Sequence, residues 1–330
     1  MAQNKPNQKK TPKKSIYKVL WKLFAFGWIA IILYFVMLSL GWFGFMPSFE
    51  ELENPKSNLA TEVYSADGEV LGVIGVENRS NITQNFYDNL ASQYDKLFLD
   101  WQSATHEQAV ILNRLFQENG FDKTANILDC ACGIGTQAIG LAALGYSVTA
   151  SDISDGEIAE AKVRAENNQV KIRFEHADFC ALSEVFAEQF DIVICMDNAL
   201  PHMLSESALE AAIKSITNQI TDGGMFVASI RDYDALLMDK PPYSPPYIHK
   251  TDKGQKVSFQ TWVWEDEHYK LTQYIIDDED TLQISKFDCE YRATRREELT
   301  NLLVANGCSE VVWKFPDETG FYQPIVIAKK

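Results

Sequence analysis

The sequence has 330 residues, of which 46% are hydrophobic and 23% charged, enough for one large globular domain or two ordinary ones. Its formal net charge is −16, which argues against a nucleic-acid-binding surface because phosphate groups are neutralised by clustered lysine and arginine. The charge is uneven, since residues 1–22 contain seven lysines and no acidic residue.

The six cysteines all follow residue 129, and four of them lie in apolar runs typical of buried strands. They form no C-x-x-C pair, and the five histidines do not cluster with them. We therefore expect reduced, mostly buried thiols and neither a disulfide framework nor a metal site.

An apolar segment follows the lysine-rich tail. From Leu23 to Met46 the chain has 24 consecutive uncharged residues, and a helix that crosses a bilayer needs about 20. Trp21, Trp28 and Trp42 lie near the ends of this run or inside it, roughly where interfacial aromatic residues anchor such a helix. The sequence thus predicts a membrane-spanning helix over residues 23–46. The lysines before it would stay in the cytoplasm and place the following residues outside.

Residues 47–82 form an acidic linker followed by two short alternating runs, 60–65 and 70–76, with a hairpin signal at Asp67-Gly68. Together with the tail and the apolar segment, the stretch "VYSADGEVLG…ENRSN" resembles the N-terminal anchor of a class A penicillin-binding protein. The resemblance covers about a quarter of the chain. No E-D-x-x-F block or K-T-G motif follows it, so the chemistry of that family is not predicted.

A different pattern occupies residues 83–330, where amphipathic helices are predicted over 86–100 and 105–119. Strands and helices then alternate, which favours βαβ units and a parallel sheet. The predicted strands cover 126–131, 147–152, 172–177, 190–196 and 224–230, and the helices 134–145, 155–167 and 206–220. After Arg231 we expect an antiparallel ribbon over 256–277, a helix over 295–306 and closing strands at 311–315 and 324–328.

The segment "ILDCACGIGTQA" places Gly133 and Gly135 directly after the first of these strands. With Ala138 they formally fit the dinucleotide pattern G-x-G-x-x-G/A, which is a weak match by itself. Asp129 ends the strand, and its carboxylate would repel a pyrophosphate but would attract an ammonium group. S-adenosylmethionine carries an ammonium group and a sulfonium, and it is therefore the predicted cofactor.

Two further acids end the next two strands. Asp152 can accept both ribose hydroxyls, and Asp178 can accept the adenine amino group while Phe179 stacks on the base. The neighbouring residues expected to line the same site are Ala131, Ile153 and Met196. Acids at the ends of three successive strands, the first before a G-x-G turn, form a specific pattern.

These motifs resemble class I S-adenosylmethionine-dependent methyltransferases, and most closely the glycine and sarcosine N-methyltransferase group. "FDIVICMDNALPHM" is similar to that group's "DAVICxGNSxAHL", and "GGMFVASIRDYD" to its "GGLxVIDxRNYD". The resemblance covers residues 86–330. It implies a seven-stranded, mostly parallel Rossmann-like sheet whose last strand is antiparallel, with the ligand across the carboxyl ends of the strands.

The same resemblance implies that Asn198 and Arg231 hold the carboxylate of a small amine. A guanidinium can grip a carboxylate with two parallel hydrogen bonds, and no strong base is needed if the amine arrives neutral. Tyr87, Tyr94 and Tyr247 are expected to line the acceptor site. One further arginine of the group has no counterpart in "SATHEQAVILNRLF", which leaves the acceptor open. The predicted function is N-methylation of a small molecule such as glycine or sarcosine.

Two alternatives remain at this stage. One is a nicotinamide-dependent oxidoreductase that uses Gly133 and Gly135, and the other is a membrane-anchored envelope protein without enzymatic activity. The cofactor places the methyltransferase domain in the cytoplasm, whereas the lysine rule places it outside. Two segments that resemble unrelated proteins and meet near residue 82 suggest a fused reading frame. The oligomeric state is open.

Overall fold

The computed structural model describes residues 18, 21–29, 61–64, 70–74 and 76–330. They belong to two compact units, residues 1–61 and 62–330. Within the first unit, residues 21–29 are helical. No helix among the described residues is long and apolar enough to cross a membrane, and most of the predicted span at 23–46 lies outside them.

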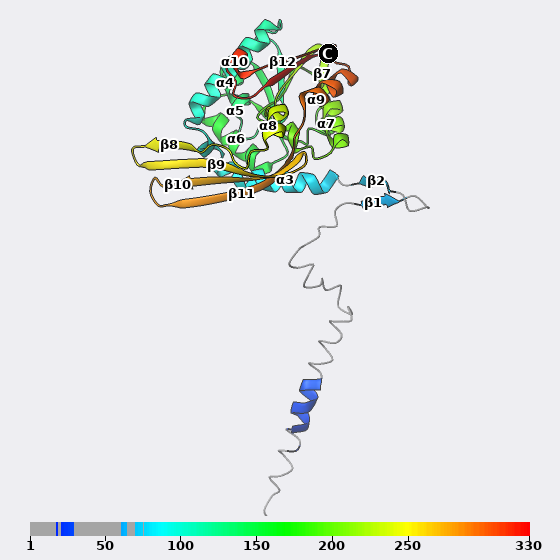
Figure 1. Ribbon diagram of the computed structural model, residues 1–330, viewed down its shortest axis with the longest axis vertical. Coiled ribbons are helices and arrows are strands. Elements are labelled where there is room, and N and C mark those ends of the chain that lie inside the picture. Colours follow the sequence, from blue (N-terminus) through cyan, green and yellow to red (C-terminus); the bar gives the residue numbers. More distant parts are fainter. Residues whose placement is uncertain (1–17, 19–20, 30–60, 65–69, 75) are drawn as a thin grey trace, which may run out of the picture. The chain divides into compact units, whose positions relative to one another are not determined.

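A seven-stranded mixed sheet forms the centre of the second unit (Figure 1). Its strands are β3 (Asn126–Asp129), β4 (Ser147–Asp152), β5 (Arg173–His176), β6 (Phe190–Cys195), β7 (Ile220–Ser229), β12 (Glu310–Lys314) and β13 (Ile325–Lys329). The order is β12-β13-β7-β6-β3-β4-β5. Strand β13 is antiparallel to both of its neighbours, and the other pairs are parallel. The predicted Rossmann-like sheet with an antiparallel last strand is confirmed.

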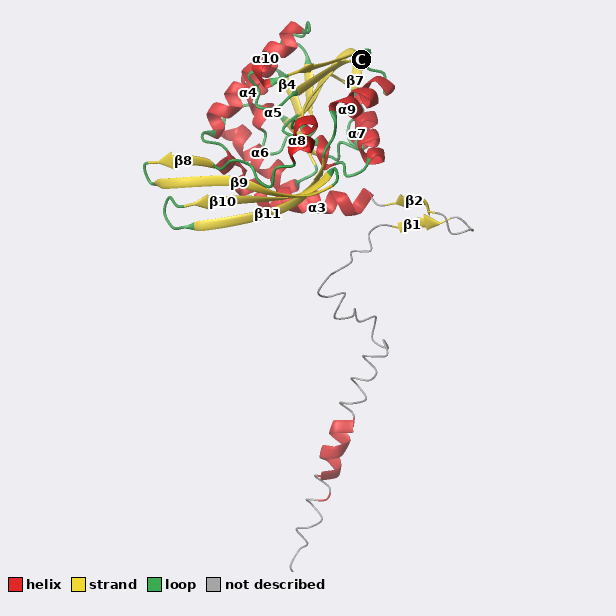
Figure 2. Cartoon of the chain, viewed as in Figure 1, coloured by secondary structure: helices red, strands yellow, loops and turns green. Residues whose placement is uncertain are grey.

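Helices surround this sheet (Figure 2). They are α3 (Val76–Leu90), α4 (Trp101–Glu118), α5 (Thr136–Ala143), α6 (Asp155–Asn167), α7 (Glu206–Asn218), α8 (Tyr233–Asp239), α9 (Arg296–Ala305) and α10 (Pro316–Thr319). Short 3₁₀ helices occur at η1 (Ala91–Leu97), η2 (Leu182–Glu184) and η3 (Leu200–His202). The bounds predicted for β4 and α6 agree with the structure.

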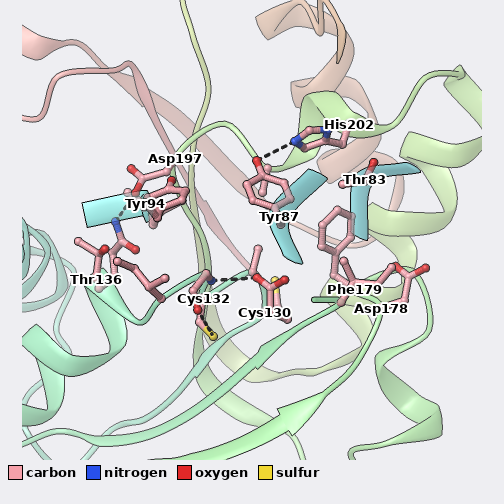
Figure 3. A pocket seen from close by; sticks show the side chains of 18 of the residues that line it. Thr83, Tyr87, Tyr94, Cys130, Cys132, Thr136, Asp178, Phe179, Asp197 and His202 are labelled. Carbon is pink, nitrogen blue, oxygen red and sulfur yellow. Dashed lines mark hydrogen bonds between the residues drawn. The ribbon is translucent and has the colours of Figure 1, made fainter. Parts of the chain in front are cut away.

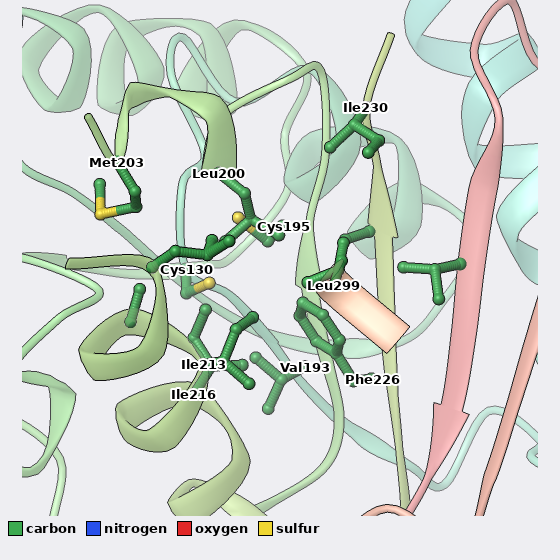
Figure 4. Close-up of a cluster of buried hydrophobic side chains, with 14 of the residues drawn as sticks. Cys130, Val193, Cys195, Leu200, Met203, Ile213, Ile216, Phe226, Ile230 and Leu299 are labelled. Carbon is green, nitrogen blue, oxygen red and sulfur yellow. The ribbon is translucent and has the colours of Figure 1, made fainter. Parts of the chain in front are cut away.

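The alternation of side chains along β6 explains why the sheet is covered on both faces. Val193 and Cys195 join a core cluster with residues of α7 and α9, drawn in Figure 4. Ile192 and Ile194 join a second cluster with residues of α4 and α5. A strand buried on both faces is apolar throughout, as "IVIC" is, and it therefore lies in the middle of the sheet.

A separate four-stranded antiparallel ribbon has the order β11-β10-β9-β8. Its strands are β8 (Tyr247–Thr251), β9 (Gly254–Glu265), β10 (His268–Asp277) and β11 (Gln283–Arg292). Figure 1 shows it projecting to one side of the central sheet. The ribbon predicted over 256–277 corresponds to β9 and β10, which pair from Lys256–Asp277 to Glu265–His268.

The region before α4 differs from the single helix predicted over 86–100. Helix α3 begins at Val76, ends at Leu90, and is followed by η1. Phe98 is extended, and the Asp100 side chain accepts a hydrogen bond from the N–H of Gln102, which starts α4. This N-cap ends the preceding turn early and starts the second helix at Trp101 instead of residue 105.

Before α3, strands β1 (Thr61–Tyr64) and β2 (Val70–Ile74) pair in a two-stranded sheet, as the alternating runs predicted. Their connection, residues 65–69, lies outside the described part of the chain. Helix α3 runs across the domain boundary predicted near residue 82. A domain that starts at residue 83 would therefore lose the first part of this helix.

Candidate active site

The glycine turn between β3 and α5 adopts a backbone conformation that favours glycine. Gly133 has φ of 52° and Gly135 has φ of 89°, both in the left-handed region. A Cβ atom on Gly135 would lie 2.9 Å from Cδ1 of Ile139, closer than real contacts allow. The turn is closed by a hydrogen bond of 2.8 Å from the N–H of Gly135 to the carbonyl of Cys132. The turn therefore holds bare backbone at the edge of the sheet.

Asp152, at the end of β4, fastens this turn. One carboxylate oxygen accepts a hydrogen bond from the N–H of Gly133 at 2.9 Å, and the other accepts one from the N–H of Ser154 at 3.0 Å. Burial raises the pKa of this carboxyl, although these backbone N–H groups act in the opposite direction. Each oxygen retains a lone pair, so Asp152 can still accept the hydroxyls of a bound ribose.

Asp129, at the end of β3, is fully buried, and no side chain among the described residues donates a hydrogen bond to its carboxylate. Burial raises its pKa well above the ordinary value, the backbone N–H groups of Ala131 and Ala138 act in the opposite direction, and the nearby Asp152 and Asp197 raise it. A buried carboxyl that no cation neutralises is costly. An ammonium group near this carboxyl would lower that cost.

A pocket lies over the glycine turn (Figure 3). Most of the predicted ligand-binding residues line it, namely Tyr87, Tyr94, Ala131, Gly133, Asp152, Ile153, Asp178, Phe179 and Met196. The lining residues include no lysine or arginine, as expected for a cationic ligand and not for a pyrophosphate. Asp129 and Gly135 are not among the lining residues.

Asp178 and Phe179 follow β5 at one side of the pocket (Figure 3). An oxygen of Asp178 accepts a hydrogen bond from the N–H of Cys180 at 2.8 Å, which fixes the direction of the carboxylate. Tyr94 and Asp197 lie at the opposite side in the same view. The pocket therefore has a carboxylate at each of these two sides.

Helix α3 and η1 cover the pocket with Tyr87 and Tyr94. The Tyr87 hydroxyl lies 2.9 Å from Nε2 of His202 and 3.5 Å from the hydroxyl of Tyr291. Burial raises the pKa of both pocket tyrosines well above the ordinary value. These phenols are therefore neutral hydrogen-bonding groups at physiological pH.

Asn198 and Arg231, the predicted acceptor-binding pair, are neighbours in the structure. Oδ1 of Asn198 accepts hydrogen bonds from the N–H of Arg231 and from the hydroxyl of Tyr233, both at 3.0 Å. The Arg231 guanidinium donates to the hydroxyl of Tyr269 at 2.6 Å and to Oε1 of Gln260 at 3.0 Å. Neither residue is part of the lining of the pocket itself.

Contacts connect Arg231 with the pocket all the same. The guanidinium carbon lies 5.3 Å from the ring centre of Tyr291, whose hydroxyl faces Tyr87 in the pocket. It also lies 5.2 Å from the ring centre of Trp262. Tyr291 thus contacts both Arg231 and the pocket residue Tyr87.

Tyr247 does not join this group of residues. It lies on β8 with 63% of its surface exposed, its ring stacked against His249 at 6.5 Å. Tyr247 and His249 lie on the same face of β8, but only His249 is buried. Tyr247 is not among the residues that line the pocket, so the expectation that it lines the acceptor site is corrected.

Several residues of the site were missed from the sequence. Asp197 lines the pocket after β6, and His202 lines it from η3. Glu157, in the first turn of α6, is fully buried beneath the glycine turn. Asp197 follows a strand as the three predicted acids do, so the same signal would have found it. An acid in a first helical turn gives no such signal, because it is common at exposed helix ends.

Comparisons with known proteins agree with this geometry. Residues 127–224 match the family model described as "Methyltransferase domain". The glycine/sarcosine N-methyltransferase of Parasynechococcus marenigrum (strain WH8102) is 27% identical over 162 residues, 49% of this chain and 56% of the relative. The glycine N-methyltransferase of Rattus norvegicus is 30% identical over 168 residues, 47% of this chain and 56% of the relative. The chain thus spans little more than half the length of these relatives.

Solved structures show the same fold. An S-adenosylmethionine-dependent methyltransferase from Clostridium acetobutylicum has a TM-score of 0.57 at 19% identity, covering 74% of this chain and 97% of the other. The amino pentose methyltransferase CalS10 from Micromonospora echinaspora, with bound S-adenosylmethionine, has a TM-score of 0.57 at 16% identity, covering 72% and 94%. Sheet order, glycine turn and these matches together identify the second unit as a class I, S-adenosylmethionine-dependent methyltransferase domain.

Proposed function

We propose that this protein transfers the methyl group of S-adenosylmethionine to the nitrogen of a small amine that carries a carboxylate, such as glycine or sarcosine. When bound, the cofactor supplies an electrophilic methyl group attached to a positively charged sulfur. We assign its ammonium group to Asp129, its ribose hydroxyls to Asp152 and its adenine to Asp178 and Phe179. The catalytic contribution of the protein is then mainly orientation and exclusion of water.

Arg231 is the observation that carries the choice of acceptor. Its guanidinium is enclosed by aromatic rings and is bonded only to neutral groups, and it forms no ion pair among the described residues. Nearby tyrosine hydroxyls offset the effect of burial and raise its pKa, so the group stays charged. Buried charges are normally paired, and an anionic ligand would complete this one.

Asn198 supports the same acceptor independently. The residue is 2% exposed, and its Nδ2 has no hydrogen-bond partner among the described residues. Its Oδ1 is occupied by two donors, so Nδ2 is the atom with unused capacity. An unsatisfied buried donor beside an unpaired guanidinium favours a ligand with two acceptor oxygens, which a carboxylate has.

Matched pairs of amines test the proposal. The full chain is incubated with S-adenosylmethionine, and S-adenosylhomocysteine is quantified by mass spectrometry. Glycine is compared with methylamine, and sarcosine with dimethylamine, because each pair differs only by the carboxylate. We expect kcat/KM to be about 100-fold or more higher for the amine with the carboxylate, since a site built for a polar group rejects analogues without it. Equal rates within each pair would refute the carboxylate assignment.

A further inference from the structure

Two consecutive residues after β6 have a left-handed backbone although neither is glycine. Asp197 has φ of 56° and Asn198 has φ of 69°. Such conformations are uncommon outside glycine and cost free energy that the surrounding structure must supply. The chain thus keeps a side chain at a position where glycine would be less strained.

The Asp197 carboxylate is held firmly at the edge of the pocket. One oxygen accepts a hydrogen bond of 2.8 Å from Nε2 of Gln137, and the other accepts one of 2.7 Å from the hydroxyl of Tyr322. Gln137 is itself buried and donates to Oε1 of Gln108 at 2.6 Å. Figure 3 shows Asp197 beside Tyr94 at the end of the pocket away from Asp178. The carboxylate is therefore preorganised and not a mobile surface group.

The position of Asp197 favours the acceptor over the cofactor as its ligand. Under the proposed function, the ammonium group of the cofactor is assigned to Asp129 at the end of β3, so Asp197 is left for a second cationic group. Asp197 directly precedes Asn198, which contacts the backbone of Arg231. Tyr322 lies close enough to both charges that Asp197 raises its pKa and Arg231 lowers it. The negatively charged Asp197 and the positively charged Arg231 thus both lie near Tyr322.

Building on the proposed function, we infer that Asp197 binds the ammonium group of the acceptor and removes one of its protons. The N–H bond breaks, its electron pair stays on the acceptor nitrogen, and the proton forms an O–H bond on the Asp197 carboxylate. The nitrogen lone pair then bonds to the methyl carbon while the carbon–sulfur pair stays on sulfur. The product nitrogen carries the positive charge, and the proton on Asp197 returns to solvent.

The surroundings of Asp197 suit this role. Burial raises its pKa, while the hydrogen bonds from Gln137 and Tyr322 lower it. The titratable groups that face it are Tyr94 from η1, Tyr322 after α10 and Asp129 from β3. A carboxylate whose pKa is moved toward neutrality is a better proton acceptor than an exposed one.

The test compares Asp197→Asn with the wild type across pH 6 to 9, using sarcosine and glycine as acceptors. In the wild type, kcat/KM should level off above the pKa of Asp197. In Asp197→Asn only the free amine can react, so kcat/KM should rise about tenfold per pH unit toward the pKa of the amine. At pH 7 the loss should be about 100-fold, at the lower end of the effect of a positioned base.

Controls separate chemistry from structure. Asp197→Gly should show the same steep pH profile and melt at the same or a higher temperature, because glycine tolerates the left-handed backbone. Asp266→Asn changes an exposed aspartate with φ of 52° in the β9–β10 turn and should keep the wild-type profile. Binding of S-adenosylhomocysteine, measured by calorimetry, should change less than about threefold in Asp197→Asn, since this cofactor product keeps the ammonium group assigned to Asp129.

Three results would overturn the inference. If the wild type is active and Asp197→Asn shows the same dependence of kcat/KM on pH, Asp197 is not the proton acceptor. The proposed function would remain intact. A tenfold or larger loss of S-adenosylhomocysteine affinity would reassign Asp197 to the cofactor. A wild type that methylates neither glycine nor sarcosine nor any other amine with a carboxylate would overturn the proposed function and this inference together.

Discussion

The carboxylate of Asp88 in α3 accepts a hydrogen bond of 2.6 Å from the hydroxyl of Ser154, the N-cap residue of α6. It also accepts one of 2.9 Å from the N–H of Gly156, whose Cβ position would lie 3.0 Å from the Cα of Asp88. This contact attaches the helix that carries Tyr87 to the loop that follows Asp152.

Asp88→Ala should therefore weaken the attachment of α3, the helix that covers the cofactor site with Tyr87. Asp88 is exposed, so we expect a modest loss of about 1 kcal/mol, or about fivefold in the Kd of S-adenosylhomocysteine. Isothermal calorimetry measures this change. Asn89→Ala, at a neighbouring exposed position of α3, should bind like the wild type. Equal affinities in all three proteins would show that the contact of Asp88 with Ser154 and Gly156 does not hold α3 over the cofactor site.

Asp152→Ala should weaken cofactor binding by about 2 kcal/mol or more, because it removes charge-assisted hydrogen bonds and releases the N–H of Gly133. The affinity for S-adenosylmethionine is measured by calorimetry. Asp155→Ala, an exposed acid three residues further on, is the matched control. Unchanged binding in Asp152→Ala, or tight binding of NAD by the wild type, would contradict the cofactor site.

Arg231→Lys should raise the KM for the acceptor sharply and leave cofactor affinity near that of the wild type. Lysine keeps the charge but loses the planar fork that contacts Tyr269 and Gln260 and would grip a carboxylate. Asn198→Ala should act in the same direction more mildly, because it removes one neutral hydrogen-bond donor. Steady-state kinetics separate KM from kcat. Arg295→Lys, at an exposed ion pair, should have no effect.

The stability of the ligand-free protein should fall as pH rises. Burial raises the pKa of Glu157 well above its ordinary value, and Asp152 raises it further. In the unfolded chain this carboxyl ionises near pH 4.3, whereas in the folded protein it stays protonated. The free energy of unfolding therefore decreases as pH rises from about 4.3 to the raised pKa of the folded state.

Glu157→Gln should therefore raise the melting temperature at pH 8 and have little effect near pH 4. Scanning calorimetry from pH 4 to 8.5 checks this difference. Glu166→Gln, an exposed residue on the same helix, should follow the wild type throughout. A Glu157→Gln protein that is destabilised at pH 8 would show that the carboxylate is ionised and paired in the folded state.

The N-terminal segment should be dispensable for catalysis. A protein that begins at residue 75 keeps all of α3, whereas one that begins at residue 82 cuts into it. We expect the longer version to retain wild-type kcat/KM. The shorter one should lose activity, because it lacks the first part of the helix that carries the pocket residues Thr83 and Tyr87. A folded but inactive longer version would show that the removed residues contribute to the site.

Sequence patterns predicted the central sheet well because its strands are apolar or alternating runs with clear ends. β4 is an alternating run that ends at Asp152, and α6 begins at a serine cap, so both bounds agree with the structure. The three acids after β3, β4 and β5 fell at one sheet edge because parallel strands bring their carboxyl ends together.

The other features of the fold and the site depend on contacts between residues far apart in the chain, which sequence patterns do not contain. Tyr247 and His249 have the same spacing in the chain as two residues on one face of a strand, yet only His249 is buried. Tyr291 contacts both Arg231 and Tyr87, although it lies 60 positions from Arg231 in the chain. Helix α8 is short and starts at the Asp232 cap, within a stretch without periodic apolar residues.

The place of β13 between β7 and β12 has a consequence for synthesis of the chain. β13 pairs with β7 and is translated long after it. The edge of β7 that receives β13 therefore stays unpaired while residues 230–324 are synthesised. An open strand edge can pair with other chains. The nascent protein should thus be most prone to aggregate, and most dependent on chaperones, during that interval.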